Sequence, residues 1–523
     1  MRELPGIFND VIGPVMRGPS SSHTAASWRI ARVALDLLNE PLKKALIEFD
    51  SDGAWAPNYR EQGTPMGFDG GLSGLDITDE RMKSAASYAL QKNIIIEYQV
   101  SSFPADHPNT VRLNLQGITG KTVQMIAVSL GGGSFEIRSV NGFPVHLNGD
   151  QYGMMAFTAG KPDISDGMKR LIPSGIDFSA EIKGDVIRYE LKSAYPFPSE
   201  LITWLKNHPV IDDVSFINPI MPVISGRERE MPFTTVSSLI DFAREKEADL
   251  GDLGLIYEEC LSGMSGAELN DMMKEIIRII HNSIDTGLKG THYADRILPQ
   301  QSHLIREAEK EGRVRDSVTN RIIENVTALM ESKSAMEVVV AAPTAGSCGT
   351  VGGSLKAVSD DLGCSEDQLV RAYFAAGIIG AYFAHGPGFS AEEHGCQVEC
   401  GAASGMAAAG IVQLMGGTAK QAIDAASMAI QNMIGLICDP VADRVEVPCL
   451  GKNISAAVNA YASAIMSVSG YDAVIPLDQV IQTVSEVGKA MPSCVKCTGK
   501  GGLAVTEAAL NIKNRISIKT INS

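Results

Sequence analysis

The stretch GCQVECGAASGMAAA, residues 395–409, starts with two cysteines and continues into a run of small, uncharged side chains. The charge-free run covers Cys400–Thr418, and similar runs cover Ala372–Ala391 and Asn453–Tyr471. Their length would suit a membrane span. However, they are rich in glycine, alanine, serine and asparagine, and neither an aromatic belt nor basic flanks frame them. We therefore expect buried helices of a soluble helical domain.

Helical patterns continue on both sides of this stretch, from about residue 234 onward. The apolar spacing predicts helices over Val236–Ala248, Gly266–Asp285, Arg321–Ser332, Ser365–Phe383, Ser404–Met415 and Ala419–Met433. A polar, turn-prone segment, Ser225–Phe233, precedes them and is typical of a linker. These patterns predict a large, mainly helical C-terminal domain over residues 232–523.

The N-terminal part of the chain alternates strand and helix patterns. A helix is predicted over Trp28–Asn39, and strands are predicted over Ala45–Phe49, Asn93–Tyr98, Thr110–Leu115, Thr122–Ser129 and Phe135–Val140. The pattern predicts an α/β domain with several antiparallel strands over residues 1–145.

A small separate unit is expected between these two domains, at residues 146–224. Its predicted elements are a strand at Phe143–Leu147, a helix at Gln151–Ala159, strands at Asp177–Ile182 and Asp185–Leu191, a helix at Pro198–Lys206 and a strand at Val214–Asn218. Two β-α-β passes indicate a ferredoxin-like layer of helices on a sheet. The whole chain is thus predicted to be an α+β multidomain protein.

Charge and cysteine content limit the possible partners. The 523 residues carry a formal net charge of −16, which repels phosphate backbones and anionic lipid, so we expect neither nucleic acid nor a membrane surface as partner. The N-terminal stretch lacks the apolar core of a secretory signal, and a cytoplasmic protein is expected. In such a protein nine cysteines indicate metal binding or catalysis rather than disulfides, although a buried cysteine is often only a small apolar side chain.

Three of these cysteines, Cys396, Cys438 and Cys449, each lie close to a glycine or proline that interrupts a helical pattern. A thiolate at such a break can turn inward, where backbone N–H groups reach the sulfur. Three thiolates suit a [4Fe–4S] cluster that keeps one iron open for substrate. A zinc site or three unrelated core cysteines remain alternatives at this point.

The motif GPSSSHT, Gly18–Thr24, stands at the start of a predicted helix. Ser20, Ser21 and Ser22 offer hydroxyls and free N–H groups that attract a carboxylate, and His23 adds a titratable group. The alternative is an ordinary serine-rich cap with a solvent-facing histidine.

Two glycine-containing segments lie in the C-terminal half. PTAGSCGT, Pro343–Thr350, follows the strand-like run Val338–Ala342, and its amides can form an anion nest, although a turn that packs two helices is equally consistent. KCTGKGGLA, Lys496–Ala504, is basic but lacks the phosphate-loop pattern, so a structural turn is expected.

The chain resembles the iron–sulfur-dependent L-serine dehydratases over nearly its whole length. Four features carry the resemblance: the three cysteines with their neighbours, GPSSSHT, PTAGSCGT and KCTGKGGLA. GPSSSHT, HPNT (His107–Thr110) and SLGGG (Ser129–Gly133) are similar to the signatures of the family's β domain. AAPTAGS, GCQVECGAASGMAAA, GLICDPVA and VEVPC are similar to those of its α domain, and the middle unit is similar to an ACT regulatory domain. The resemblance implies a fused α and β enzyme in which Cys396, Cys438 and Cys449 bind the [4Fe–4S] cluster.

The resemblance also implies a reaction, the deaminating dehydration of L-serine to pyruvate and ammonia without pyridoxal phosphate. The open iron would polarise the β-hydroxyl as a Lewis acid while a base removes the α-proton. His23 and Lys452 are the candidate catalytic residues. The candidate substrate-binding residues are Ser20, Ser21, Ser22, Thr344, Gly346, Ser347, Asn453, Lys496 and Thr498. The site would lie between the α and β domains, as pockets often do, in an enzyme expected to be a homodimer.

The chain departs from the family pattern around this expected site. Lys452 and Lys496 stand where the family usually has arginine, which replaces a planar fork by a point charge, and Cys497 stands in place of glutamate. The family's AGIxPA and GHGTD stretches are also replaced, the former by a segment that starts at Cys348. Another β-hydroxy amino acid is therefore an alternative substrate, and an amino-acid or oxygen sensor is an alternative function. Cys348 or Cys497 is further expected near the cluster, where it can occupy the fourth position in the resting enzyme.

Overall fold

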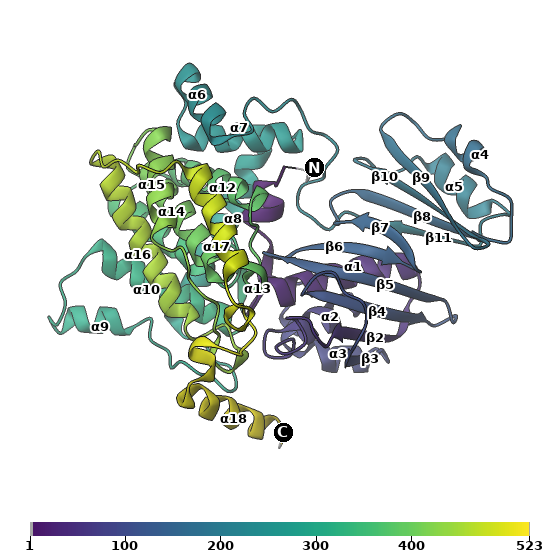
Figure 1. Cartoon of the computed structure of the whole chain (residues 1–523), viewed down its shortest axis with the longest axis horizontal. Helices are drawn as coiled ribbons and strands as arrows, with labels where there is room; N and C mark the ends of the chain where they lie inside the picture. The colour runs from purple at the N-terminus through teal and green to yellow at the C-terminus, as the bar shows by residue number, and fades with distance from the viewer. Residues whose placement is uncertain (1–3, 522–523) are drawn as a thin grey trace.

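The computed structural model describes residues 4–521, which form a helical part, a six-stranded sheet with its own helices and a smaller four-stranded sheet with two helices (Figure 1). Both large sheets come from the N-terminal half of the chain, and the C-terminal half is almost entirely helical. This arrangement confirms the predicted α+β multidomain class.

The six-stranded sheet has the order β3-β2-β4-β5-β6-β7. Its strands are β2 (Leu42–Asp50), β3 (Ile95–Ser101), β4 (Thr110–Gly117), β5 (Thr122–Gly131), β6 (Ser134–Val140) and β7 (Phe143–Leu147). Only the β2–β3 pair is parallel. Helix α1 (Ala26–Leu38) packs across β4, β5 and β6, and α2 (Thr64–Leu72) and α3 (Ala85–Gln91) follow it in this layer. The predicted strands and the predicted helix of this part are confirmed.

Strand β7 was expected in the small unit, but it pairs with β6 in the larger sheet. Asn141 and Gly142 connect the two strands, and both have positive φ, 50° and 78°. An Asn-Gly pair with this geometry favours a tight hairpin between adjacent strands. The local turn therefore decides the sheet to which β7 belongs.

The four-stranded sheet has the order β11-β8-β10-β9, and all its neighbouring strands are antiparallel. Its elements are β8 (Tyr152–Ala159), α4 (Ser165–Lys169), β9 (Ile176–Lys183), β10 (Val186–Ser193), α5 (Ser199–Asn207) and β11 (Asp213–Ile217). This β-α-β-β-α-β order is ferredoxin-like, as predicted.

The helix predicted over Gln151–Ala159 is wrong, because this segment forms strand β8. Met154 and Ala156 belong to the core of the small unit, while Met155 between them belongs to the core of the larger sheet. A strand that is buried on both faces has a continuous apolar run, which periodicity alone does not distinguish from a helix.

The helical part surrounds α14 (Cys400–Leu414), which packs against α11, α12, α15 and α16. The other helices are α6 (Val236–Lys246), α7 (Leu250–Ser262), α8 (Gly266–Lys289), α9 (Leu304–Lys310), α10 (Val318–Ser334), α11 (Cys348–Leu362), α12 (Glu366–His385), α13 (Ala391–His394), α15 (Ala419–Gln431), α16 (Cys449–Val468), α17 (Leu477–Ala490) and α18 (Glu507–Ile521). The six predicted helices are confirmed. Among residues 4–521, none of the helices is both long and apolar enough for a bilayer crossing.

The start of the chain joins the sheets to the helical part. The helical turn η1 (Ile7–Val11) packs on α12, and β1 (Val15–Arg17) pairs antiparallel with β12 (Val338–Val340). At a second point, Gly131 at the end of β5 forms a bridge with Phe389. The motif GPSSSHT directly follows β1, so it lies at the seam between the two parts.

Candidate metal centre

The three cysteines singled out above lie at interruptions between helices. Cys396 starts a short 3-10 turn between α13 and α14, Cys438 lies in the loop after α15, and Cys449 is the first residue of α16. All three side chains are buried. The sulfurs of Cys396 and Cys438 and a carboxylate oxygen of Glu399 lie within 4.8 Å of one another. Cys449 lies near enough for the charge of Cys396 to act on its thiol.

Two lysines supply positive charge beside these thiols. Lys452 Nζ lies 3.9 Å from Cys396 Sγ and donates to Asp439 Oδ1 at 2.7 Å. Lys333 is fully buried, donates to the carbonyl of Val445 and lies near Cys449. Burial is the main cause that raises the pKa of the Cys449 thiol, to about 12. A buried thiol of this kind becomes a thiolate readily only when a cation binds it, so the donor set fits a thiolate-bound metal group.

Glu399 is a residue of this site that the sequence analysis missed. Its Oε1 accepts a hydrogen bond from Thr344 Oγ1 at 2.8 Å, and the Cys396 thiol donates to its Oε2 at 3.7 Å. Burial and then the charge of Glu392 raise the pKa of Glu399 to about 7. The signal was present, because Glu399 is three residues after Cys396 in GCQVEC.

The segment Thr344–Ser347 lies between Glu399 and the N-terminal part. Thr344 Oγ1 lies 3.0 Å from Ser347 Oγ, and the backbone N–H of Ala345 donates to Ser21 Oγ at 3.1 Å. Asn453 Nδ2 donates to the carbonyl of Gly346 at 2.7 Å. The segment therefore connects GPSSSHT with the helix that starts at Cys449. It leads directly into α11, which the sequence did not predict.

His23 lies in the helical turn η2 (Ser21–Ala25) and is fully buried, so the solvent-facing alternative is wrong. Its Nδ1 lies 2.9 Å from Ser22 Oγ and 3.2 Å from Ser20 Oγ, and its Nε2 donates to Asn58 Oδ1 at 2.8 Å. Burial lowers the pKa of His23, which favours the neutral ring. Ser22 Oγ also donates to Glu392 Oε1 of the helical part at 3.4 Å.

The C-terminal segment reaches the site through Cys497. Asn58 Nδ2 donates to the Cys497 carbonyl at 3.1 Å, and Cys497 packs with Cys396 and Cys438 in one buried cluster. Lys496 forms a backbone bridge with Cys438. Thr498 Oγ1 instead donates to the carbonyl of Ser493 in its own loop.

Cys348 and Asn58 are two further residues around this site. Cys348 is buried at the start of α11, and Lys333 is its charged neighbour. It is not a member of the buried cluster of Cys396, Cys438 and Cys497. Asn58, which contacts both His23 and Cys497, carried no recognisable sequence signal because it lies in a stretch without a motif.

Residues 200–504 match the family model described as serine dehydratase alpha chain. The chain belongs to this family. It is 33% identical to the probable L-serine dehydratase alpha chain of Bacillus subtilis, over 54% of this chain and 95% of that protein. It is 40% identical to the probable beta chain of the same organism, over 27% of this chain and 63% of that protein. It is 33% identical to L-serine dehydratase 1 of Escherichia coli K12, over 52% of this chain and 62% of that protein.

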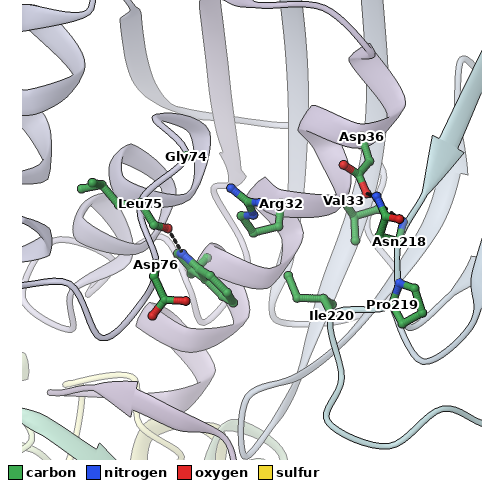
Figure 2. Close-up of a pocket in the computed structure, with 10 residues that line it drawn as sticks. Arg32, Val33, Asp36, Gly74, Leu75, Asp76, Asn218, Pro219 and Ile220 are labelled. Carbon is green, nitrogen blue, oxygen red and sulfur yellow. Dashed lines mark hydrogen bonds between the residues drawn. The ribbon is translucent and has the colours of Figure 1, made fainter.

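This member of the serine dehydratase family also has a cavity of about 350 Å³ away from the cysteines. Figure 2 shows Arg32 and Asp36 of α1, the loop Gly74–Asp76 and the segment Asn218–Ile220 around it. Asp36 Oδ2 accepts from the backbone N–H of Asn218 at 2.8 Å. None of the predicted site residues lines this cavity, so the chemistry inferred from the motifs is not located there.

Proposed function

We propose that the chain is a [4Fe–4S]-dependent L-serine ammonia-lyase, which converts L-serine to pyruvate and ammonia. The observation that carries the proposal is a set of three buried cysteines at three helix breaks, in which the sulfurs of Cys396 and Cys438 lie within 4.8 Å of each other and Cys449 is near enough to feel the charge of Cys396. Relatives named L-serine dehydratase support the reaction. Similarity to both an alpha and a beta chain supports a fused enzyme, and the ferredoxin-like order of the four-stranded sheet supports an ACT-type unit in between.

The bound cluster would supply a Lewis-acidic iron that makes the substrate's β-hydroxyl a better leaving group. The side chains at the seam would hold the substrate. Ser20, Ser21 and Ser22 approach it from the N-terminal part, and Thr344 and Ser347 approach from the helical part. Their hydroxyls and the nearby amides suit a carboxylate and an ammonium group.

We assign proton transfer to His23 and to the hydroxyl and carboxylate groups around it. Its neutral ring, with Nε2–H donated to Asn58, leaves Nδ1 as the acceptor that faces Ser20 and Ser22. Because Ser22 Oγ also reaches Glu392 Oε1, a proton can pass between the two parts of the chain through this hydroxyl. Pyridoxal phosphate has no role in this proposal.

Lys452 is better explained as a positioning residue than as a substrate ligand. Its ammonium group donates hydrogen bonds to Asp439 Oδ1 and to the Ile437 carbonyl, each at 2.7 Å, and lies beside Cys396. The lysine at position 452 therefore gives no reason to expect a different substrate. We accordingly propose L-serine itself, in a cytoplasmic homodimer.

The proposal is tested by anaerobic purification, iron and sulfide analysis, and keto-acid release from L-serine, L-threonine, L-cysteine and larger β-hydroxy amino acids. About four irons per chain and fastest turnover of L-serine are expected. Cys396→Ser, Cys438→Ser and Cys449→Ser should each lower the iron content and abolish turnover. The matched control is Cys364→Ser, outside the cysteine cluster, which should retain both. Iron-free protein after reconstitution, or unchanged iron in the three serine variants, would refute the proposal.

A further inference from the structure

Cys497 lies beside two of the three proposed cluster ligands. Cys396, Cys438 and Cys497 are 3%, 5% and 6% exposed and pack together with Ala391 in one small cluster. The thiols of Cys438 and Cys497 are close enough for a side-chain hydrogen bond. A thiol at position 497 therefore lies directly beside two of the proposed cluster ligands.

The backbone holds Cys497 against Cys438. The Cys438 N–H donates to the Val495 carbonyl at 2.8 Å, and the Cys497 N–H donates to the Cys438 carbonyl at 2.9 Å. Cys497 has a φ of 61°, in the left-handed region that residues with a side chain rarely adopt. Such strain persists only where the surroundings enforce it, and it is concentrated at functional sites.

Two amide side chains from the N-terminal part complete the surroundings of Cys497. Gln62 Nε2 donates to its sulfur at 3.7 Å, and Asn58 Nδ2 donates to its carbonyl at 3.1 Å. A cysteine that served only as an apolar core residue would need neither the strained backbone nor a hydrogen-bond donor at its sulfur. A sulfur that carries thiolate charge is stabilised by such a donor.

We propose that Cys497 is a fourth thiolate donor of the metal site in the substrate-free enzyme, positioned by Asn58 and Gln62 and displaced from the iron when L-serine binds. The inference rests on the proposed iron–sulfur cluster. Thiolate is the protein ligand that such clusters favour, and Cys497 packs in the same buried cluster as two proposed ligands, Cys396 and Cys438. Ligation requires no oxidant or reductant, since the thiol proton is released to solvent when the sulfur binds iron.

The first test compares cluster integrity in Cys497→Ser with that in wild type and in Cys494→Ser. Cys494 is an exposed cysteine three residues earlier in the same loop, which makes it the matched control. After anaerobic reconstitution, each protein is treated with ferricyanide and its iron and electron paramagnetic resonance spectrum are measured. Cys497→Ser should lose about one iron in four and show a [3Fe–4S] signal. Wild type and Cys494→Ser should resist the loss.

The second test needs no variant, so it remains valid if Cys497→Ser folds poorly. Iron-loaded and iron-free wild-type protein are alkylated with iodoacetamide, and the modification of Cys497 is followed by mass spectrometry. Loading should slow this modification at least tenfold, while Cys494 reacts equally in both forms. Equal rates at Cys497, or equal iron loss in Cys497→Ser and wild type, would overturn the inference. Failure of wild type to bind iron at all would instead overturn the proposed function.

Discussion

At the scale of single residues, the metal centre depends on a small number of polar side chains that lie beside the cysteine thiols. Lys452 is the clearest case, because it is largely buried, pairs with the buried Asp439 and lies beside Cys396. Removing one partner of a buried ion pair leaves the other charge uncompensated. The lysine should therefore contribute both to folding and to the retention of a negatively charged cluster.

Lys452→Met is expected to lower the free energy of unfolding by about 3 kcal/mol and to reduce the iron content of the reconstituted protein. Lys452→Arg keeps the charge and should retain most of both. Urea unfolding and iron analysis measure the two effects. A methionine variant with wild-type iron and an unchanged unfolding midpoint would show that Lys452 does not stabilise the site.

At the scale of elements, a buried carboxylate joins the N-terminal turn to helix α7. Glu258 Oε2 accepts from the backbone N–H of Ile7 at 2.7 Å, and its side chain is completely buried. Burial and then the charge of Asp10 raise the pKa of Glu258 to about 7, from 4.5. Since the folded state binds this proton more tightly, the contribution of Glu258 to stability is greatest at low pH and falls as pH rises from 4.5 to about 7.

Glu258→Gln removes this titration and keeps an acceptor for the N–H of Ile7. Relative to wild type, the variant should gain about 3 kcal/mol of unfolding free energy between pH 4.5 and pH 8. Urea unfolding at the two pH values measures the change. A stability difference that does not vary with pH would contradict the assignment.

Predictability from sequence also differed between elements. Strands with one apolar face, such as Thr110–Gly117, and helices with clear periodicity, such as Gly266–Lys289, were predictable from local pattern. Strand β8 was not, because two different cores bury its two faces. Helix α11 was missed because its first turns, Cys348-Gly349-Thr350-Val351-Gly352-Gly353, contain poor helix formers that tertiary packing overrides.

The metal ligands were easier to predict than their surroundings. The cysteines are marked by residue type and by adjacent glycine and proline, whereas Asn58 is placed by contacts to His23 and Cys497, 35 and 439 positions away. Contacts of that separation leave no local pattern. The same reason hid Lys333, whose charge is recognisable only once Val445 and Cys449 are seen around it.

At the scale of the whole molecule, the site is complete only when the N-terminal part packs against the helical part. Gly131 forms a backbone junction between them, with a φ of 90°, and a Cβ there would lie 2.8 Å from the Phe389 carbonyl carbon and the Ser390 nitrogen. Backbone atoms cannot move aside as a flexible side chain can, so a larger residue would push the two parts away from each other.

Gly131→Ala is expected to lower the free energy of unfolding by about 2–3 kcal/mol and to reduce turnover. Gly120→Ala is the control, because Gly120 has a similar φ of 96° with no atom within 4 Å of the added Cβ. It should show the effect of backbone strain alone. Equal losses in the two variants, by thermal or urea unfolding, would mean that the contact with Phe389 contributes nothing.

The central claim is that thiolates of this chain hold an iron–sulfur cluster with one iron available to L-serine. Mössbauer spectroscopy of the chain reconstituted with ⁵⁷Fe, recorded with and without L-serine, tests it most directly. We predict that about a quarter of the iron signal shifts when L-serine is added, and that the remainder is unchanged. A spectrum without cluster iron, or one that L-serine leaves unaltered, would contradict the account.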